Sequence, residues 1–264
     1  MTGNGGARTG TGLVDMRLDG VEVKVTISGN GTPHAVHAVQ ALRLPAGRPS
    51  WQIYFCEDVT AGLSVGTPLL DGGVILRART KSGGNGDTTV KLRPCRRSRL
   101  TDRWLAAEQG DDWELEVEAD WAGERRLLAA SLTADRDENT STATNLGDGS
   151  VEDLFIDEQL AFLRDCSSIG INLNTLSVLP PVAATRWGSV DAAPAGLDVR
   201  AERWTVGDLD FLELSVVADV EQAMAAQQQL AGFVGSLGLD APPDQETKTP
   251  QVMRHLVGQV LARP

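Results

Sequence analysis

Features that mark several other classes of protein are scarce or missing in this sequence. Cysteine occurs three times in 264 residues, and positions 56, 95 and 166 have no spacing typical of a disulfide framework or a zinc site. No apolar run approaches the roughly 18 residues of a membrane-spanning helix, and the first residues, MTGNGGARTGTG, lack the apolar core of a signal peptide. We therefore expect a soluble, cytoplasmic protein with no membrane partner.

Basic residues are outnumbered by acidic ones. The chain has 24 lysines and arginines against 36 aspartates and glutamates, a formal net charge of -12. A general nucleic-acid-binding protein needs a basic surface to neutralise phosphates, so this balance argues against nucleic acid as a partner. Any site for an anion must therefore be a local concentration of positive charge.

The frequent glycines and few aromatic residues favour many strands and turns over a helical bundle. Residues 1–15 are predicted to be a disordered tail, and residues 16–264 to form a single domain. Alternation predicts strands at 21–27, 51–55, 73–80, 88–93, 113–121, 182–190, 199–205 and 211–217. Helical spacing and start signals predict helices at 33–42, 151–166, 220–237 and 250–261. Residues 134–150 are expected to form a long exposed loop.

Several predicted strands pair one apolar face with one strongly charged face. In residues 20–27, Glu22 and Lys24 lie opposite a row of valines. In residues 211–217, Glu213 shares a face with Ser215. The charged face of residues 113–121 carries four carboxylates: Glu114, Glu116, Glu118 and Asp120.

The segment SGGNGD joins two of these strands into a hairpin, whose centre we place at Asn85. That centre pairs Arg79 with Lys91 and Arg77 with Arg93, so that four cations project from one face. Like charges directly opposite each other destabilise a sheet. These four cations therefore require a compensating negative charge, either from the protein or from a ligand.

Two architectures explain the charged faces. An open sheet would pack its apolar face on a core and expose its charges to water. A closed barrel would turn the charges into a wet lumen and cover its apolar outside with amphipathic helices. A cationic lumen wall would bind phosphate oxygens, and a carboxylate wall would suit Mg2+ or Mn2+.

Between residues 21 and 258 the sequence resembles the CYTH superfamily, also called triphosphate tunnel metalloenzymes. The segment GVEVK matches the family's Glu-x-Glu-x-Lys strand at Glu22 and Lys24, with Gly20 in place of the first Glu. Its basic strands are matched by LLDGGVILRAR, TTVKLRP and VAATRWGSV, and its acidic strand by WELEVEAD. The last strand pair matches LDVRAERWTVGDLDFLELSV, with Ser215 in place of a carboxylate, and ETKTP supplies the late lysine.

The resemblance implies an α+β fold, a closed antiparallel β-barrel or tunnel of about eight strands with helices packed outside. It also implies the site residues. Six cations would bind phosphate: Arg77, Arg79, Lys91, Arg93, Arg186 and Lys248. Four carboxylates would hold Mg2+ or Mn2+: Glu22, Glu116, Glu118 and Glu213. Three residues are the catalytic candidates: Glu22, Lys24 and Glu116. The acidic strand leaves open whether Glu114, Glu116 or Glu118 is the ligand.

The resemblance implies a metal-dependent phosphohydrolase that acts on a triphosphate-bearing or polyphosphate small molecule. One alternative is nucleotide cyclisation, as in the adenylyl cyclases of the family. A second is a binding module without catalysis, which Gly20 and Ser215 favour because both replace family carboxylates. A third is a tunnel that binds a different anion.

Overall fold

The computed structural model describes residues 17–30, 34–47, 50–59, 66–81, 84–107, 109–137, 150–239 and 246–262. The predicted tail 1–15 and most of the predicted loop 134–150 lie outside these residues. Within the described part of the chain, no helix is long and apolar enough to span a membrane.

The described chain forms ten strands: β1 (Gly20–Asn30), β2 (Trp51–Glu57), β3 (Val74–Lys81), β4 (Gly84–Leu92), β5 (Trp113–Ala122), β6 (Arg125–Arg136), β7 (Ser177–Val178), β8 (Val182–Trp187), β9 (Arg200–Val206) and β10 (Leu209–Ala218). Every predicted strand has a counterpart here. The sequence prediction missed β6, whose residues were assigned in part to the exposed loop, and the short β7.

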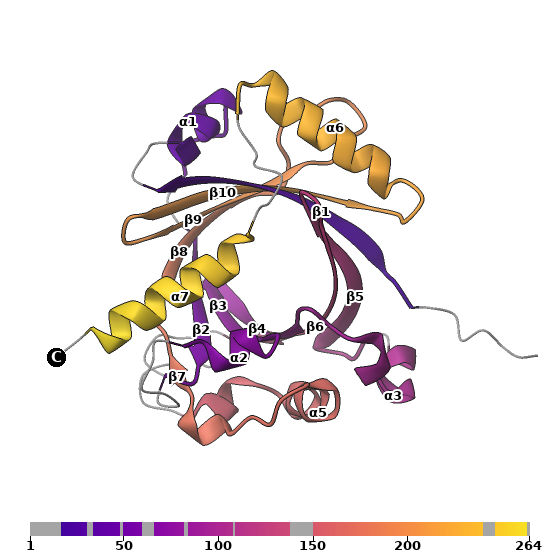
Figure 1. The fold of residues 1–264 in the computed structure, drawn as a ribbon, viewed down its shortest axis with the longest axis vertical. Coiled ribbons are helices and arrows are strands. Elements are labelled where there is room, and N and C mark those ends of the chain that lie inside the picture. The colour runs from indigo at the N-terminus through magenta and orange to yellow at the C-terminus, as the bar shows by residue number, and fades with distance from the viewer. Residues whose placement is uncertain are drawn as a thin grey trace, which may run out of the picture.

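The strands form a closed barrel, seen end-on in Figure 1. Their order is β3-β4-β6-β5-β1-β10-β9-β8-β2-β7, and β2 also pairs with β3, which closes a ring of nine described strands with β7 outside it. The predicted α+β class and closed barrel are confirmed. The strands are not all antiparallel, because β1 and β5 are parallel. A closed ring with an odd number of strands must contain at least one parallel pair, since directions cannot alternate all the way round.

In the described residues, the helices with α geometry are α1 (His34–Ala41), α2 (Pro68–Asp71), α3 (Asp102–Ala106), α5 (Asp157–Cys166), α6 (Ala223–Ser236) and α7 (Lys248–Leu261). Three short 3-10 turns lie at η1 (Arg97–Arg99), η2 (Val151–Leu154) and η3 (Leu173–Thr175). The helix predicted at 151–166 is therefore divided into η2 and α5.

Two groups of helices cover the outside of the barrel. The helices α1 and α6 lie on β1 and β10, where Val23 and Leu212 pack with Ala38 and Leu230. The helices α3 and α5 lie on the outer faces of β3 to β6 (Figure 1). The apolar faces predicted from alternation are thus the outer faces of the barrel, and the helices keep them from water.

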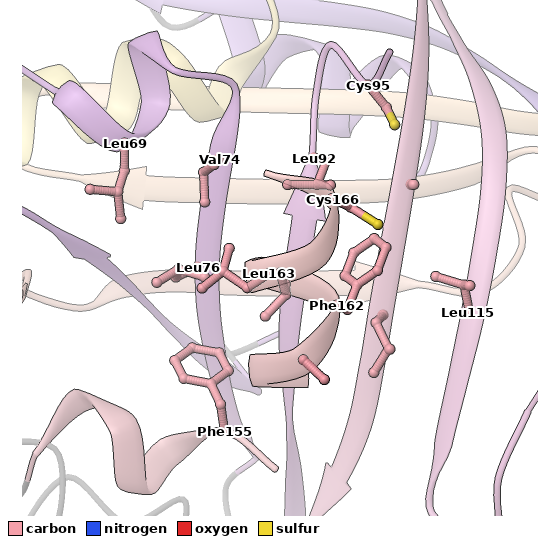
Figure 2. Close-up of a cluster of buried hydrophobic side chains, with 14 of the residues drawn as sticks. Leu69, Val74, Leu76, Leu92, Cys95, Leu115, Phe155, Phe162, Leu163 and Cys166 are labelled. Atoms are coloured by element: carbon pink, nitrogen blue, oxygen red, sulfur yellow. The ribbon is translucent and has the colours of Figure 1, made fainter. Parts of the chain in front are cut away.

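The helix α5 is held on the barrel by packing and by one buried amide. Phe162 is fully buried, with its ring centroid 5.2 Å from that of Trp104. The side-chain amide of Gln159 donates hydrogen bonds to the carbonyl oxygens of Thr88 at 2.8 Å and Leu132 at 3.0 Å. The amide is thereby satisfied in an apolar environment. Figure 2 shows part of this cluster, including Leu76, Leu92, Phe162 and Leu163.

The helix α7 packs differently, against the inward-facing side of the barrel. Val252, Met253 and Leu256 of α7 join Phe55 and Trp204 in a third apolar cluster. In Figure 1 this helix crosses the barrel with its N-terminal end over the middle of the ring. The helix therefore makes part of the barrel interior apolar and brings its own first residues to the interior.

Truncation of Phe162 tests the contact between α5 and the barrel. Phe162→Ala should lower the free energy of unfolding by about 3–5 kcal/mol, because it removes a buried ring and leaves a cavity. Met224→Ala is the control, since this side chain is 59% exposed on α6 and should change stability by less than about 0.5 kcal/mol. Urea unfolding measures both. Equal effects of the two substitutions would contradict the packing described for α5.

Candidate functional site

A cavity of about 160 Å³ lies inside the barrel. All six cations predicted to bind phosphate line it, together with Lys24, Glu22 and Glu213. They come from β1, β3, β4, β8, β10 and the start of α7, segments that are far apart in the sequence. The alternation of each strand turns these side chains inward, because the neighbouring apolar residues face the outer helices. The closed barrel thus concentrates the charge that the sequence distributes over the whole chain.

Lys24 lies among carboxylates from two strands. Its Nζ is 2.7 Å from Glu22 and 3.1 Å from Asp120, and Arg93 lies 2.9 Å from the same oxygen of Asp120. Burial by itself would lower the pKa of Lys24, but the charges of Glu22, Asp120 and Glu213 outweigh it and raise the pKa above its ordinary value. Burial likewise opposes ionisation of Asp120, yet Lys24 and Arg93 hold its pKa below the usual range. Lys24 and Asp120 are therefore both ionised at neutral pH.

A second cluster surrounds the first residue of α7. Lys248 pairs with Glu213 at 3.0 Å and also with Glu202, while Arg186 lies 3.5 Å from Glu202. The ammonium group is 4.3 Å from the ring centroid of Trp204, a cation–π contact. Burial opposes ionisation of Glu202, but Lys248 and then Arg186 outweigh it and lower the pKa to about 2.

The β3–β4 hairpin carries a third cluster, and its register differs from the prediction. Arg79 lies opposite Asp87, and Arg77 lies opposite Thr89. The predicted partners were Lys91 and Arg93, four positions further along the strand. The observed register places opposite charges together, with Arg79 and Asp87 2.7 Å apart, whereas the predicted one would have opposed like charges.

Arg77 is the cavity cation with the weakest protein counterion. Its Nη2 donates to the hydroxyl of Thr89 at 2.9 Å, and its Nε has no hydrogen-bond partner among the described residues. Burial, and then the charge of Arg79, lowers the pKa of Arg77 to about 10. The guanidinium is still protonated at neutral pH. It is therefore a buried positive charge that an anion would stabilise.

Positive charge slightly exceeds negative charge in the interior. Seven cations line the cavity. Six carboxylates pair with them: Glu22, Asp87, Glu118, Asp120, Glu202 and Glu213. Seven minus six leaves one net positive charge in a chain whose formal net charge is -12. The interior is thus locally basic inside an acidic protein.

The acidic strand contributes different residues from those expected. Glu118 pairs with Lys91 at 2.8 Å, but Glu116 is exposed and lines a separate hollow beside Arg17. The physical reason is the register with β1, which pairs Gly20 with Glu118 and Glu22 with Asp120. Residues before Glu118 extend beyond the start of β1. Glu116 therefore has no β1 wall beside it, and Asp120 takes the inner position.

Although Glu116 is exposed as a residue, partial desolvation of its carboxyl group and then the charges of Glu118 and Glu114 raise its pKa. The acidic row contributes more to this shift than the cavity residues Lys91 and Glu22 do. Glu114 is exposed as well. Asp120 belongs to the same alternating row as Glu118. Alternation in the sequence shows that the carboxylates of β5 share one face of the strand. Only the pairing register with β1 shows which of them lie inside the barrel.

The described carboxylates do not fit a preformed Mg2+ or Mn2+ site. Across the part of the chain that the structure describes, no three acidic, histidine or cysteine side chains gather in an arrangement that would hold a metal ion. Glu22, Glu118 and Glu213 are each paired with a lysine. Position 20, where the sequence has glycine in place of a family glutamate, has room for a side chain, because a Cβ there would lie at an ordinary 3.4 Å from Val217.

A larger hollow of about 740 Å³ lies outside the barrel, beside α5. Arg103 and Arg164 line it together with Asp157 and Glu158, and the side chains of both arginines are largely exposed. Exposed charges of both signs are screened by water and interact weakly with a ligand. The smaller cavity inside the barrel is therefore the better candidate for the functional site.

No protein-family model and no curated protein sequence matches the chain. Solved structures, however, match most of the chain. A candidate adenylate cyclase from Bacillus halodurans has 12% identity and a TM-score of 0.53, over 88% of this chain and 96% of that one. A candidate adenylyl cyclase from Hippeastrum, with a dominant triphosphatase activity, has 13% identity and a TM-score of 0.48, over 89% and 95%. The first comparison shows that this chain shares its closed-barrel fold with that structure over most of both chains.

Proposed function

We propose that the cavity binds the phosphate chain of a triphosphate-bearing or polyphosphate small molecule and that the protein hydrolyses a phosphoanhydride bond in it. The observation that carries this proposal is that seven cations line one cavity inside the barrel. Lysine and arginine form short, charge-assisted hydrogen bonds with phosphate oxygens. An interior of this kind is costly to desolvate, so it is best explained by a highly charged ligand.

The size of the cavity supports phosphates rather than a whole nucleotide as the enclosed part. Its volume is about 160 Å³, below the roughly 300–1,000 Å³ typical of sites that enclose a drug-sized organic ligand. An organic group would therefore extend out of the barrel. Phosphates alone, as in tripolyphosphate, would use the cations without any contact to a base or sugar.

Ligand binding would exchange the partners of the cations. The carboxylates that now neutralise Lys91 and Lys248 would be replaced by phosphate oxygens, which carry more charge. The present ion pairs hold the side chains of these cations in place. The cations are thus already positioned before a ligand binds. Preorganised charge of this type is the main contribution that proteins make to phosphoryl transfer.

In the proposed reaction, a water oxygen forms a bond to the terminal phosphorus and the bridging P–O bond breaks. The shorter chain leaves with the bridging oxygen, the cations stabilise the charge that develops on it, and a proton of the attacking water passes to the released phosphate or to solvent. Glu22 lines the cavity. Burial would raise its pKa, but Lys24 and Lys91 outweigh burial and lower it. Glu22 is thus an ionised carboxylate that would orient the attacking water, with Lys24 holding it in place.

The metal dependence that the resemblance implies has no preformed ligand set to support it, so we assign no step to Mg2+ or Mn2+. The same observation favours a second function, binding of polyphosphate without hydrolysis. Gly20 and Ser215 stand where family carboxylates are expected, and the remaining carboxylates neutralise lysines. The two functions share the binding step and differ in turnover.

Substitution of the cavity cations tests binding and turnover together. Arg79→Ala and Lys91→Ala should each weaken tripolyphosphate binding about 10- to 100-fold, because each removes a charge-assisted contact. Isothermal titration measures affinity, and phosphate release is followed with EDTA, Mg2+ or Mn2+. Release under any of these conditions supports hydrolysis, and binding without release supports the binding module.

Arg164→Ala is the matched control, because the Arg164 side chain is 71% exposed on α5, outside the barrel. It should leave the affinity for tripolyphosphate unchanged. If Arg79→Ala and Lys91→Ala behave like this control, the cavity is not the phosphate site.

Removal of one carboxylate tests the exchange of partners. Glu118→Gln frees Lys91 from an ion pair of 2.8 Å, so tripolyphosphate should bind about 3- to 10-fold more tightly in metal-free buffer. Glu124→Gln, at an exposed position between β5 and β6, changes the net charge equally and should have no such effect. Weaker binding by Glu118→Gln would show that this carboxylate assists the ligand instead of competing with it.

A further inference from the structure

Two buried N–H donors in the cavity wall have no acceptor among the described residues. They are the indole Nε1 of Trp204 and the guanidinium Nε of Arg77, and both residues line the cavity. Trp204 is only 2% exposed. Buried N–H groups in folded proteins are almost always hydrogen-bonded, so each of these donors requires an explanation.

The ring of Trp204 is held in place by its neighbours. Phe55 packs against it with the ring centroids 5.8 Å apart, and Phe55 lies directly opposite Arg77 in the β2–β3 pair. The ammonium of Lys248 lies 4.3 Å from the indole ring centroid and is itself paired with Glu202 and Glu213. Phe55 thus contacts the indole ring and is the strand neighbour of Arg77, while the charge of Lys248 screens the two carboxylates beside the indole.

The start of α7 belongs to the wall of the same cavity. Thr247, Lys248 and Thr249 line it, and Thr247 occupies the N-cap position of this 14-residue helix without a side-chain capping bond. The hydroxyl of Thr247 instead accepts a hydrogen bond from Arg93 Nη2 at 3.3 Å. The first N–H groups of a helix have no partner within the helix, and its dipole favours an anion there.

We propose that Trp204, Arg77 and the first turn of α7 together bind a terminal phosphate group, so that the tunnel recognises linear phosphate chains by their free end. This inference rests on the proposed function, which it narrows to one class of ligand. A terminal phosphate presents three non-bridging oxygens, whereas an internal phosphate presents two. Donor-bearing residues from β3, β9 and α7 line this one cavity, and such a set would match a chain end better than an internal unit of the chain.

Trp204→Phe removes the indole N–H and keeps an aromatic ring for Phe55 and Lys248. The loss of one hydrogen bond to a charged phosphate should weaken binding of linear tripolyphosphate roughly 10- to 100-fold. Cyclic trimetaphosphate has no terminal phosphate, so its affinity should be unchanged. Isothermal titration of both anions measures the ratio of the two affinities.

Trp104→Phe is the matched control. Trp104 is also buried, at 1% exposure, but its Nε1 donates to Asp165 at 3.0 Å outside the barrel. It should leave both affinities unchanged. In wild-type protein labelled with 15N, the indole resonance lost in Trp204→Phe should shift when tripolyphosphate is added, and that of Trp104 should stay. This measurement does not depend on how stable the variants are.

The outcomes separate the two proposals. Wild-type protein that fails to bind tripolyphosphate would overturn the proposed function and this inference with it. If wild type binds and Arg79→Ala weakens binding, the proposed binding step stands. Equal losses for linear and cyclic anions in Trp204→Phe, no loss for either, or an unshifted Trp204 resonance would then overturn recognition of the chain end alone.

Discussion

The structure depends on pairing between opposite charges that point into a closed barrel. Lysines and arginines from β1, β3, β4, β8 and α7 meet carboxylates from β1, β4, β5, β9 and β10. If either the cations or the carboxylates were missing, the other set would be buried and unpaired, at a cost of several kcal/mol for each ion. The outer helices depend on the same arrangement, because charges that face inward leave apolar residues on the outside of every strand. Charge pairing inside and apolar packing outside are thus two results of one alternation.

Much of this could be predicted because alternation is a local property. The segment 20–27 shows without any structure that Glu22 and Lys24 share a face, and the six phosphate-binding candidates do line one cavity. The charged faces by themselves were compatible with an open sheet as well as with a closed barrel, and closure was predicted from the resemblance to the CYTH superfamily. The strand β6 was missed because RRLLAASLTADR contains consecutive apolar residues in place of a strict alternation.

The features that could not be predicted all depend on register or on distant contacts. Alternation fixes the face of Arg79 but not its partner, so Asp87 was found only in the structure. In the acidic strand, the same face includes Glu116, which is exposed, and Asp120, which is enclosed. Only the pairing of Gly20 with Glu118 distinguishes them. The uncapped start of α7 and the free indole N–H of Trp204 likewise depend on which elements meet in space.

The pairing of β1 with β10 has a consequence for how the chain acquires this structure. Val21 lies beside Ala218, and Asn30 beside Leu209. The strand β1 can therefore pair with β10 only after almost 200 further residues have been synthesised. Contacts between residues so distant in sequence slow folding, because the intervening chain must be ordered first. On the ribosome, the amino-terminal strand would emerge long before its neighbour, and Lys248 later still. A chain that stops before β10 would lack both a strand of the barrel and Lys248, and the cavity would be incomplete.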